Sequence, residues 1–228
     1  MAFTSTSQTD WTRSDIYHNS FLIPPNNALT AALKLSEKHG LPPYAVSEAQ
    51  GKFLNLLAQS IQARRMLEIG TLGGYSTIWL ANALPDDGEL LTCEISKDFA
   101  MIAQINIDNA GLTDKVKIIV GPAITTLSNI KSNASFDLAF IDADKQSNVE
   151  YFIQAKRLVR KGGVIIVDNV VRNGRVADPD QSDSNIDGVR KLLEYIGDDP
   201  TIEATTLGTV GEKGYDGFLY AINKPNIS

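Results

Sequence analysis

The 228-residue chain is long enough for one domain with a sizeable hydrophobic core. Hydrophobic residues make up 43% of it and charged residues 21%, proportions that exclude a disordered, collagen-like or low-complexity chain. The 21 Lys and Arg residues against 27 Asp and Glu residues give a net charge of -6. Because no basic run is present either, nucleic acid and anionic membranes are not expected as partners.

The rare residues exclude further classes of site. A single cysteine, Cys93, can form neither an internal disulfide nor a thiolate metal cage. The only histidines, His18 and His39, precede every glycine-rich or acidic motif, which argues against a histidine triad or a zinc site. The chain begins without a signal peptide, and no stretch approaches the ~20 apolar residues of a membrane span. We therefore expect a cytoplasmic protein whose metal, if any, has oxygen ligands.

The N-terminal part of the chain predicts helices. Residues 1–13 are polar and rich in Thr and Ser, which predicts a flexible arm. Helical patterns follow over residues 27–38 and 47–62, and Ser47 followed by Gln50 is a capping-box signature.

From residue 65 onward, short apolar runs alternate with helical stretches. The predicted strands are residues 66–70, 89–95, 116–121, 136–144, 163–169, 201–208 and 215–223. Strands joined through helices require a parallel sheet covered on both faces, whereas the last two runs have no helix between them. The sequence therefore predicts one α/β domain over residues 1–228. Its sheet is doubly wound, mostly parallel and Rossmann-like, with an antiparallel edge strand and N-terminal helices.

Ligands of such sheets bind at the carboxyl ends of the strands. A glycine-rich turn from Glu68 to Ser76 follows the first strand, and Glu94 ends the second, 94 − 70 = 24 residues after Gly70. An acid near this offset accepts hydrogen bonds from ribose hydroxyls, but Leu72 stands where a dinucleotide fingerprint needs glycine. S-adenosylmethionine (SAM), which has a ribose and no phosphates, fits better. The alternatives are that the glycines only shape the turn and that Glu94 caps a helix.

Acidic residues end the fourth and fifth predicted strands. Asp142, Asp168 and Asn169 could converge there as oxygen ligands for Mg²⁺, Mn²⁺ or Ca²⁺, or the acids could simply cap the following helices. Lys145 could be a solvated lysine or a base beside the cation. An NAD(P)-dependent oxidoreductase shares the fold and Glu94 but leaves this cluster unexplained. A non-catalytic nucleoside-binding module is the third possibility.

Four stretches, LEIGTLGGYST, TCEIS, FIDADK and GGVIIVDNVVRNGRVADP, resemble the cation-dependent class I O-methyltransferases related to caffeoyl-CoA and catechol O-methyltransferases. The resemblance extends from about Val46 to Phe218. It implies a sheet of the class I methyltransferase type, SAM and a divalent cation as cofactors, and usually a homodimer.

The resemblance also implies roles for individual residues. The implied cofactor contacts are Val46, Glu68, Gly70, Ser76, Glu94, Ile95, Ala123, Asp142 and Tyr151. The implied metal ligands are Asp142, Asp168 and Asn169, and the implied catalytic residues are Lys145 and Asp142. Two positions depart from the family: Pro122 follows Gly121 where the family commonly has an acid near the adenine, and Asn148 replaces an aromatic residue.

These features predict methyl transfer from SAM to one hydroxyl of a small vicinal diphenol of the catechol, phenylpropanoid or flavonoid type. The two hydroxyls would bind the cation, and Lys145 would receive the proton. We expect the acceptor pocket to be formed by the N-terminal arm and by residues 172–185.

Overall fold

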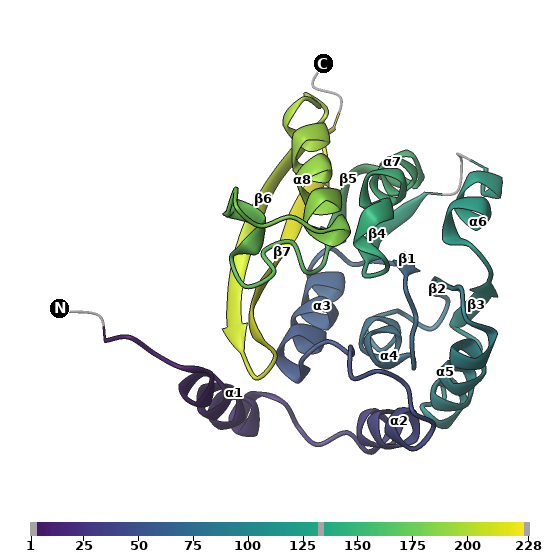
Figure 1. Ribbon diagram of the computed structural model, residues 1–228. Coiled ribbons are helices and arrows are strands. Elements are labelled where there is room, and N and C mark those ends of the chain that lie inside the picture. Colours follow the sequence, from purple (N-terminus) through teal and green to yellow (C-terminus); the bar gives the residue numbers. More distant parts are fainter. Residues whose placement is uncertain (1–3, 132–134, 226–228) are drawn as a thin grey trace.

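A seven-stranded sheet with helices on both faces forms the protein (Figure 1). The computed structural model describes residues 4–131 and 135–225. The strands are β1 (Arg65–Ile69), β2 (Glu89–Glu94), β3 (Val116–Val120), β4 (Phe136–Ile141), β5 (Val159–Val167), β6 (Ile202–Gly211) and β7 (Gly214–Asn223). Their order is β3-β2-β1-β4-β5-β7-β6; the first five are parallel, and β7 is antiparallel to both β5 and β6. The predicted fold class and its antiparallel edge are confirmed.

Helices precede the sheet and connect its strands. The α-helices are α1 (Gln8–Leu22), α2 (Asn27–Lys38), α3 (Glu48–Ser60), α4 (Tyr75–Ala81), α5 (Lys97–Asn109), α6 (Ala123–Asn129), α7 (Asn148–Leu158) and α8 (Ser184–Gly197). Two short 3₁₀ helices, η1 (Lys145–Ser147) and η2 (Arg175–Ala177), lie in loops. Within the described ranges, no helix combines the length and the hydropathy needed to span a bilayer.

The N-terminal segment differs from its prediction. A flexible arm was expected to residue 13, but α1 begins at Gln8. The carboxylate of Asp10 accepts hydrogen bonds from the backbone N–H of Ser7 (3.0 Å) and from its hydroxyl (2.9 Å), which closes the first turn. Residues 1–3 of the predicted arm lie outside the described residues.

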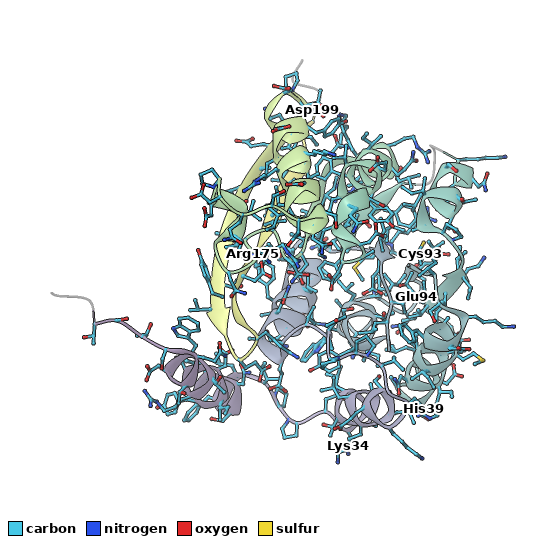
Figure 2. The ribbon with its side chains drawn as sticks, in the orientation of Figure 1. Lys34, His39, Cys93, Glu94, Arg175 and Asp199 are labelled. Atoms are coloured by element: carbon cyan, nitrogen blue, oxygen red, sulfur yellow. The ribbon has the colours of Figure 1, made fainter. Side chains whose placement is uncertain are left out.

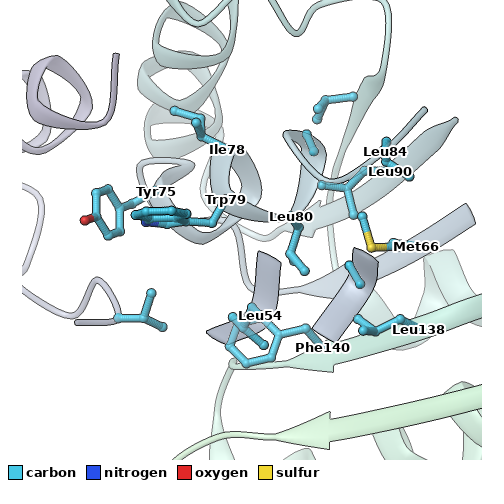
Figure 3. Packing of buried hydrophobic residues seen from close by; sticks show 14 of the residues in the cluster. Leu54, Met66, Tyr75, Ile78, Trp79, Leu80, Leu84, Leu90, Leu138 and Phe140 are labelled. Atoms are coloured by element: carbon cyan, nitrogen blue, oxygen red, sulfur yellow. The ribbon is translucent and has the colours of Figure 1, made fainter. Parts of the chain in front are cut away.

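Alternating side chains divide the core into two layers. Met66 on β1 faces α2, α3, α4 and α5, in a cluster that includes Leu54 and Phe140 (Figure 3). Leu67 and Ile69 face the opposite side, where α6, α7 and α8 pack. The sheet is therefore buried on both faces, as parallel sheets require.

The strand order reverses between β1 and β4, because β2 and β3 follow on one side and β5 on the other. The hydrogen-bond ladder continues one residue past these strands: Asp142 N–H donates to Ile69 O (2.8 Å), and Asp168 N–H donates to Ile141 O (2.9 Å). The loops that follow β1, β4 and β5 therefore leave the sheet at one edge. This edge is where doubly wound sheets bind ligands.

Two leucines of α3 give a direct test of this core. Leu54 is fully buried and Leu56 is 52% exposed. Leu54→Ala should lower the free energy of unfolding by about 2–5 kcal/mol, because it leaves a cavity against the sheet. Leu56→Ala, the control on the same helix, should change it by less than about 1 kcal/mol. Urea unfolding at 25 °C measures both, and equal losses would contradict the assigned packing.

Candidate active site

The turn after β1 passes unusually close to the end of β4. Gly70 has φ +103°, and a Cβ atom there would lie 2.2 Å from the carbonyl oxygen of Asp142. Gly74, with φ +81°, begins α4 in the left-handed conformation. Leu72 is also left-handed, with φ +50°. The backbone conformation of the turn therefore requires both glycines, which agrees with the alternative that the glycines shape the turn.

Glu94 ends β2 (Figure 2), and its carboxylate binds the backbone of this turn. One carboxylate oxygen accepts the backbone N–H groups of Leu72 (2.8 Å) and Thr71 (3.3 Å), and the other accepts that of Ser96 (2.9 Å). Glu94 therefore fixes the backbone of the glycine turn. The residue whose side chain caps α5 is Ser96, not Glu94, and it accepts from Phe99 N–H.

Glu68 lies behind the turn with no exposed surface. Its carboxylate accepts hydrogen bonds from the hydroxyls of Ser76 (2.7 Å), Thr77 (2.5 Å) and Thr92 (2.7 Å). Burial, the largest cause, raises the pKa of Glu68 to about 7 in spite of these donors. The structure therefore connects Glu68 to the ligand-facing side of the turn through Ser76, rather than exposing its carboxylate there.

Asp142 and Asp168 occupy neighbouring strand ends, since Ile141 of β4 is in register with Val167 of β5. Asp168 is 5% exposed, and burial together with the negative charge of Asp142 raises its pKa to about 7. Lys145 counters this charge; its Nζ lies 2.9 Å from Asp142 Oδ1, and its side chain is 7% exposed. The alternative that Lys145 is a solvated surface lysine is therefore excluded.

Asn169 follows directly in the left-handed conformation, with φ +56°, and donates its backbone N–H to Asp168 Oδ1 (2.9 Å). A residue that was not singled out for this site also comes close to it: the side chain of Gln50 opposes part of the rise in the pKa of Asp168. The capping-box pattern identified Gln50, whose backbone N–H donates to Ser47 Oγ (3.1 Å). Gln50 therefore combines a place in the first turn of α3 with a side chain near Asp168.

The donor set suits a hard divalent cation. Asp142, Asp168 and Asn169 offer only oxygen ligands, and a single lysine ammonium balances the two carboxylates. Across residues 4–131 and 135–225 no group of three or more His, Cys, Asp or Glu side chains is placed to hold a metal. A cation would therefore need the amide residue and oxygens of water or substrate besides the two acids.

Tyr151 is fixed by the loop after β4. Its hydroxyl donates to Asp144 Oδ1 (2.5 Å), and the hydroxyl of Ser147 donates to the other oxygen of Asp144 (2.6 Å). Burial and the Asp144 carboxylate raise the pKa of Tyr151. The ring is 6% exposed, so Tyr151 stabilises the loop that carries Asp142 and Lys145.

A cavity of about 420 Å³ opens beside the turn. Three of the predicted residues, Val46, Ser76 and Asp142, line it. Its other walls come from α2, residues 41–46 and Lys213 at the tip of the β6–β7 hairpin. In the described part of the chain, neither of the two segments expected to form the acceptor pocket, the N-terminal arm and residues 172–185, lines this cavity.

Ile95 and Ala123 lie at the carboxyl ends of β2 and β3, outside that cavity. Ile95 is 75% exposed directly after Glu94, leaving an apolar surface at this edge. Ala123 is the first residue of α6 and follows Gly121, whose φ is +138°. These two residues therefore lie at the same edge of the sheet as the acidic pair, at β2 and β3 rather than at β4 and β5.

Comparison with known proteins identifies the family of the chain. Residues 25–217 match the sequence profile described as O-methyltransferase. The chain is 47% identical over 208 residues to a catechol O-methyltransferase of Mycobacterium tuberculosis, covering 91% of this chain and 94% of that protein. The chain belongs to the O-methyltransferase family.

Solved structures agree with this assignment. An O-methyltransferase from Bacillus cereus in complex with SAH superposes with a TM-score of 0.93 at 47% identity, over 96% of this chain and 100% of that one. TomG from Streptomyces achromogenes, in complex with SAM, gives a TM-score of 0.92 at 44% identity, over 97% and 100%. The protein is a SAM-dependent O-methyltransferase, which decides against the oxidoreductase and the binding module.

The raised pKa of Glu68 predicts a pH dependence of stability. In the folded state Glu68 keeps its proton up to about pH 7, whereas in the unfolded state it releases the proton at the ordinary pKa of 4.5. Between these two pH values, the buried Glu68 therefore lowers the free energy of unfolding progressively as the pH rises. Glu68→Gln removes this titration. Across that window the free energy of unfolding of the variant should gain about 3 kcal/mol relative to the wild type. Urea unfolding at several pH values measures the difference, and parallel curves would contradict the raised pKa.

Proposed function

We propose that this O-methyltransferase methylates one hydroxyl of a small vicinal diphenol with the help of a divalent cation. The observation that carries the proposal is the pair of carboxylates at neighbouring strand ends: Asp142 lines the cavity and binds the buried Lys145, and Asp168 is buried beside it. The name of the mycobacterial relative, catechol O-methyltransferase, supports the diphenol. Mg²⁺ is the expected cation, with Mn²⁺ and Ca²⁺ as alternatives.

The glycine turn and its supports form the cofactor side of the proposed site. SAM supplies a methyl group on a positively charged sulfur. Val46, Gly70 and Ser76 would surround its methionine part, with Ser76 held by Glu68. Glu94 would accept hydrogen bonds from the ribose hydroxyls while it holds the turn, and the exposed side chain of Ile95 would pack on the adenine together with Ala123.

The acidic pair and Lys145 form the acceptor side. A cation held by Asp142, Asp168 and Asn169 would supply a Lewis acid next to the acceptor hydroxyls. Methyl transfer forms an O–CH₃ bond as the S–CH₃ bond breaks, and the hydroxyl proton must leave. We assign Lys145 Nζ, held 2.9 Å from Asp142 Oδ1 in a buried position, to receive it in the form of the neutral amine, because an ammonium has no lone pair for the proton.

A homodimer is part of the proposal. Four large apolar side chains of α1, namely Ile16, Tyr17, Phe21 and Leu22, are 62% to 74% exposed in the single chain. Exposed apolar surface of this kind favours a protein contact. Sedimentation equilibrium of the intact chain measures its oligomeric state. A monomer at micromolar concentration would refute the proposed homodimer.

The test of the function compares acceptors and cations. Activity with a catechol should disappear in excess EDTA and return with Mg²⁺ or Mn²⁺, because only oxygen ligands are available. The monohydroxy analogue should react at least about a hundred times more slowly at equal saturation, since it has lost the second oxygen that fixes the ring. Comparable rates for both acceptors, or full activity after exhaustive chelation, would refute the proposal.

Variants assign the cation response to the acidic pair. Asp168→Ala should abolish the restoration of activity by Mg²⁺, because it removes a buried carboxylate that no neighbour replaces. Asp180→Ala, in the exposed loop before α8, is the control and should respond like the wild type. An unchanged cation response in Asp168→Ala would place the cation elsewhere.

Glu94 gives a separate test of the cofactor side. Glu94→Ala should weaken SAM binding by about 1.5–3 kcal/mol, the typical contribution of hydrogen bonds to a charged group. Glu89→Ala, at the exposed beginning of the same strand, is the matched control and should bind SAM like the wild type. Isothermal titration calorimetry on the folded proteins decides it. Unchanged affinity in Glu94→Ala would limit Glu94 to holding the turn.

A further inference from the structure

The turn after β5 has a backbone conformation that needs external support. Asn169, Arg172 and Asn173 all adopt positive φ, at +56°, +53° and +58°, and Gly174 follows at +78°. Residues other than glycine adopt this conformation at a cost in free energy. Three such residues within five positions are stable in this conformation only where contacts with neighbouring groups stabilise the turn.

That support comes from β7, about forty-five residues further along the chain. Four consecutive backbone N–H groups of the turn donate to residues 215–217. The bonds are Val170 to Gly217 O (2.9 Å), Val171 to Asp216 Oδ1 (3.1 Å), Arg172 to Asp216 Oδ1 (2.7 Å) and Asn173 to Tyr215 O (3.0 Å). Every residue between Asn169 and Gly174 is therefore bound to β7.

The carboxylate of Asp216 is at the centre of this arrangement. Its Oδ1 accepts the N–H groups of Val171 and Arg172, and also that of Gly217 (2.9 Å). Among the described residues it has no ion-pair partner, so its charge acts on backbone N–H groups alone. Gly217 permits the close approach, because a Cβ atom there would lie 2.6 Å from Val171 Cγ2 and 2.5 Å from Leu207 O.

We infer that Asp216 is a positioning residue for the oxygen ligands: it fixes the turn and thereby holds Asn169 in the left-handed conformation next to Asp168. The connection is direct, since the tethered residues begin immediately after Asn169, whose own N–H is bonded to Asp168 Oδ1. The inference rests on the proposed cation site. It adds a residue on the antiparallel strand β7 to a set of ligands that follow β4 and β5.

The charge of Asp216 defines how its variants should behave. A charged acceptor binds N–H groups more strongly than a neutral one, so Asp216→Asn, which keeps an oxygen at the same place, should retain part of the tether. Asp216→Ala removes the acceptor and leaves the N–H groups of Val171 and Arg172 without their partner. The matched control is Asp199→Ala, because Asp199 likewise accepts a backbone N–H through Oδ1, from Thr201 (3.0 Å), but lies at the opposite end of the sheet (Figure 2).

The experiment measures Mn²⁺ and SAM affinity by calorimetry, the former on the SAM-loaded protein, together with amide hydrogen exchange of residues 170–173. Asp216→Ala should weaken Mn²⁺ binding about tenfold or more and accelerate exchange in the turn by a similar factor, while SAM affinity stays within about twofold. Asp216→Asn should fall between this variant and the wild type. If Asp216→Ala does not fold, the exchange and Mn²⁺ shifts of Asp216→Asn decide the question.

The outcomes separate this inference from the proposed function. Wild-type protein that binds no Mn²⁺ would refute the cation site itself. Wild-type protein that binds Mn²⁺, together with unchanged affinity and exchange in both Asp216 variants, would refute only the positioning role. Equal losses in Asp199→Ala would also refute it, because the effect would then be a general loss of stability.

Discussion

The glycine turn after β1 and the end of β4 approach one another so closely that Gly70 has no space for a side chain. This contact joins the two halves of the site. The turn belongs to the side assigned to the methyl donor, and Asp142, whose carbonyl faces Gly70, belongs to the side assigned to the acceptor. Group transfer between two bound molecules requires reacting atoms within about 3–3.5 Å of each other. A sheet whose neighbouring strand ends nearly touch provides such proximity before any ligand binds.

Carboxylates around this contact fall into two groups. Glu68, Glu94 and Asp216 direct their oxygens at hydroxyl or backbone donors of their own chain, and so fix α4, the glycine turn and the turn after β5. Asp142 and Asp168 instead lie at neighbouring strand ends, and the ammonium of Lys145 is bound to Asp142. The first group makes the backbone rigid, and the second retains capacity for a ligand. Preorganised sites generally need both, since chemistry depends on groups that do not move.

The sequence predicted the strands and the residues at their ends, because apolar runs and strand-end positions are local properties. It therefore placed Glu94, Asp142 and Asp168 at one edge. Contacts set by tertiary packing were not predictable: Gln50 comes close to Asp168 only because of the way α3 lies against the sheet, and in the sequence Asp216 looks like an ordinary residue of a strand. The beginning of α1 was missed because a polar composition concealed its cap.

The tip of the β6–β7 hairpin connects the cavity to the first helix. Gln8 donates to the carbonyls of Gly211 (2.8 Å) and Glu212 (3.1 Å), Asp15 accepts the N–H of Glu212 (2.8 Å), and the next residue, Lys213, lines the cavity. Strand β7 then runs to Asn223 at the opposite edge of the sheet (Figure 1). An affinity tag fused before α1 would thus be attached to the helix that holds this hairpin and its cavity-lining lysine. One fused after β7 would be attached at the opposite edge of the sheet, and is the better choice for purification.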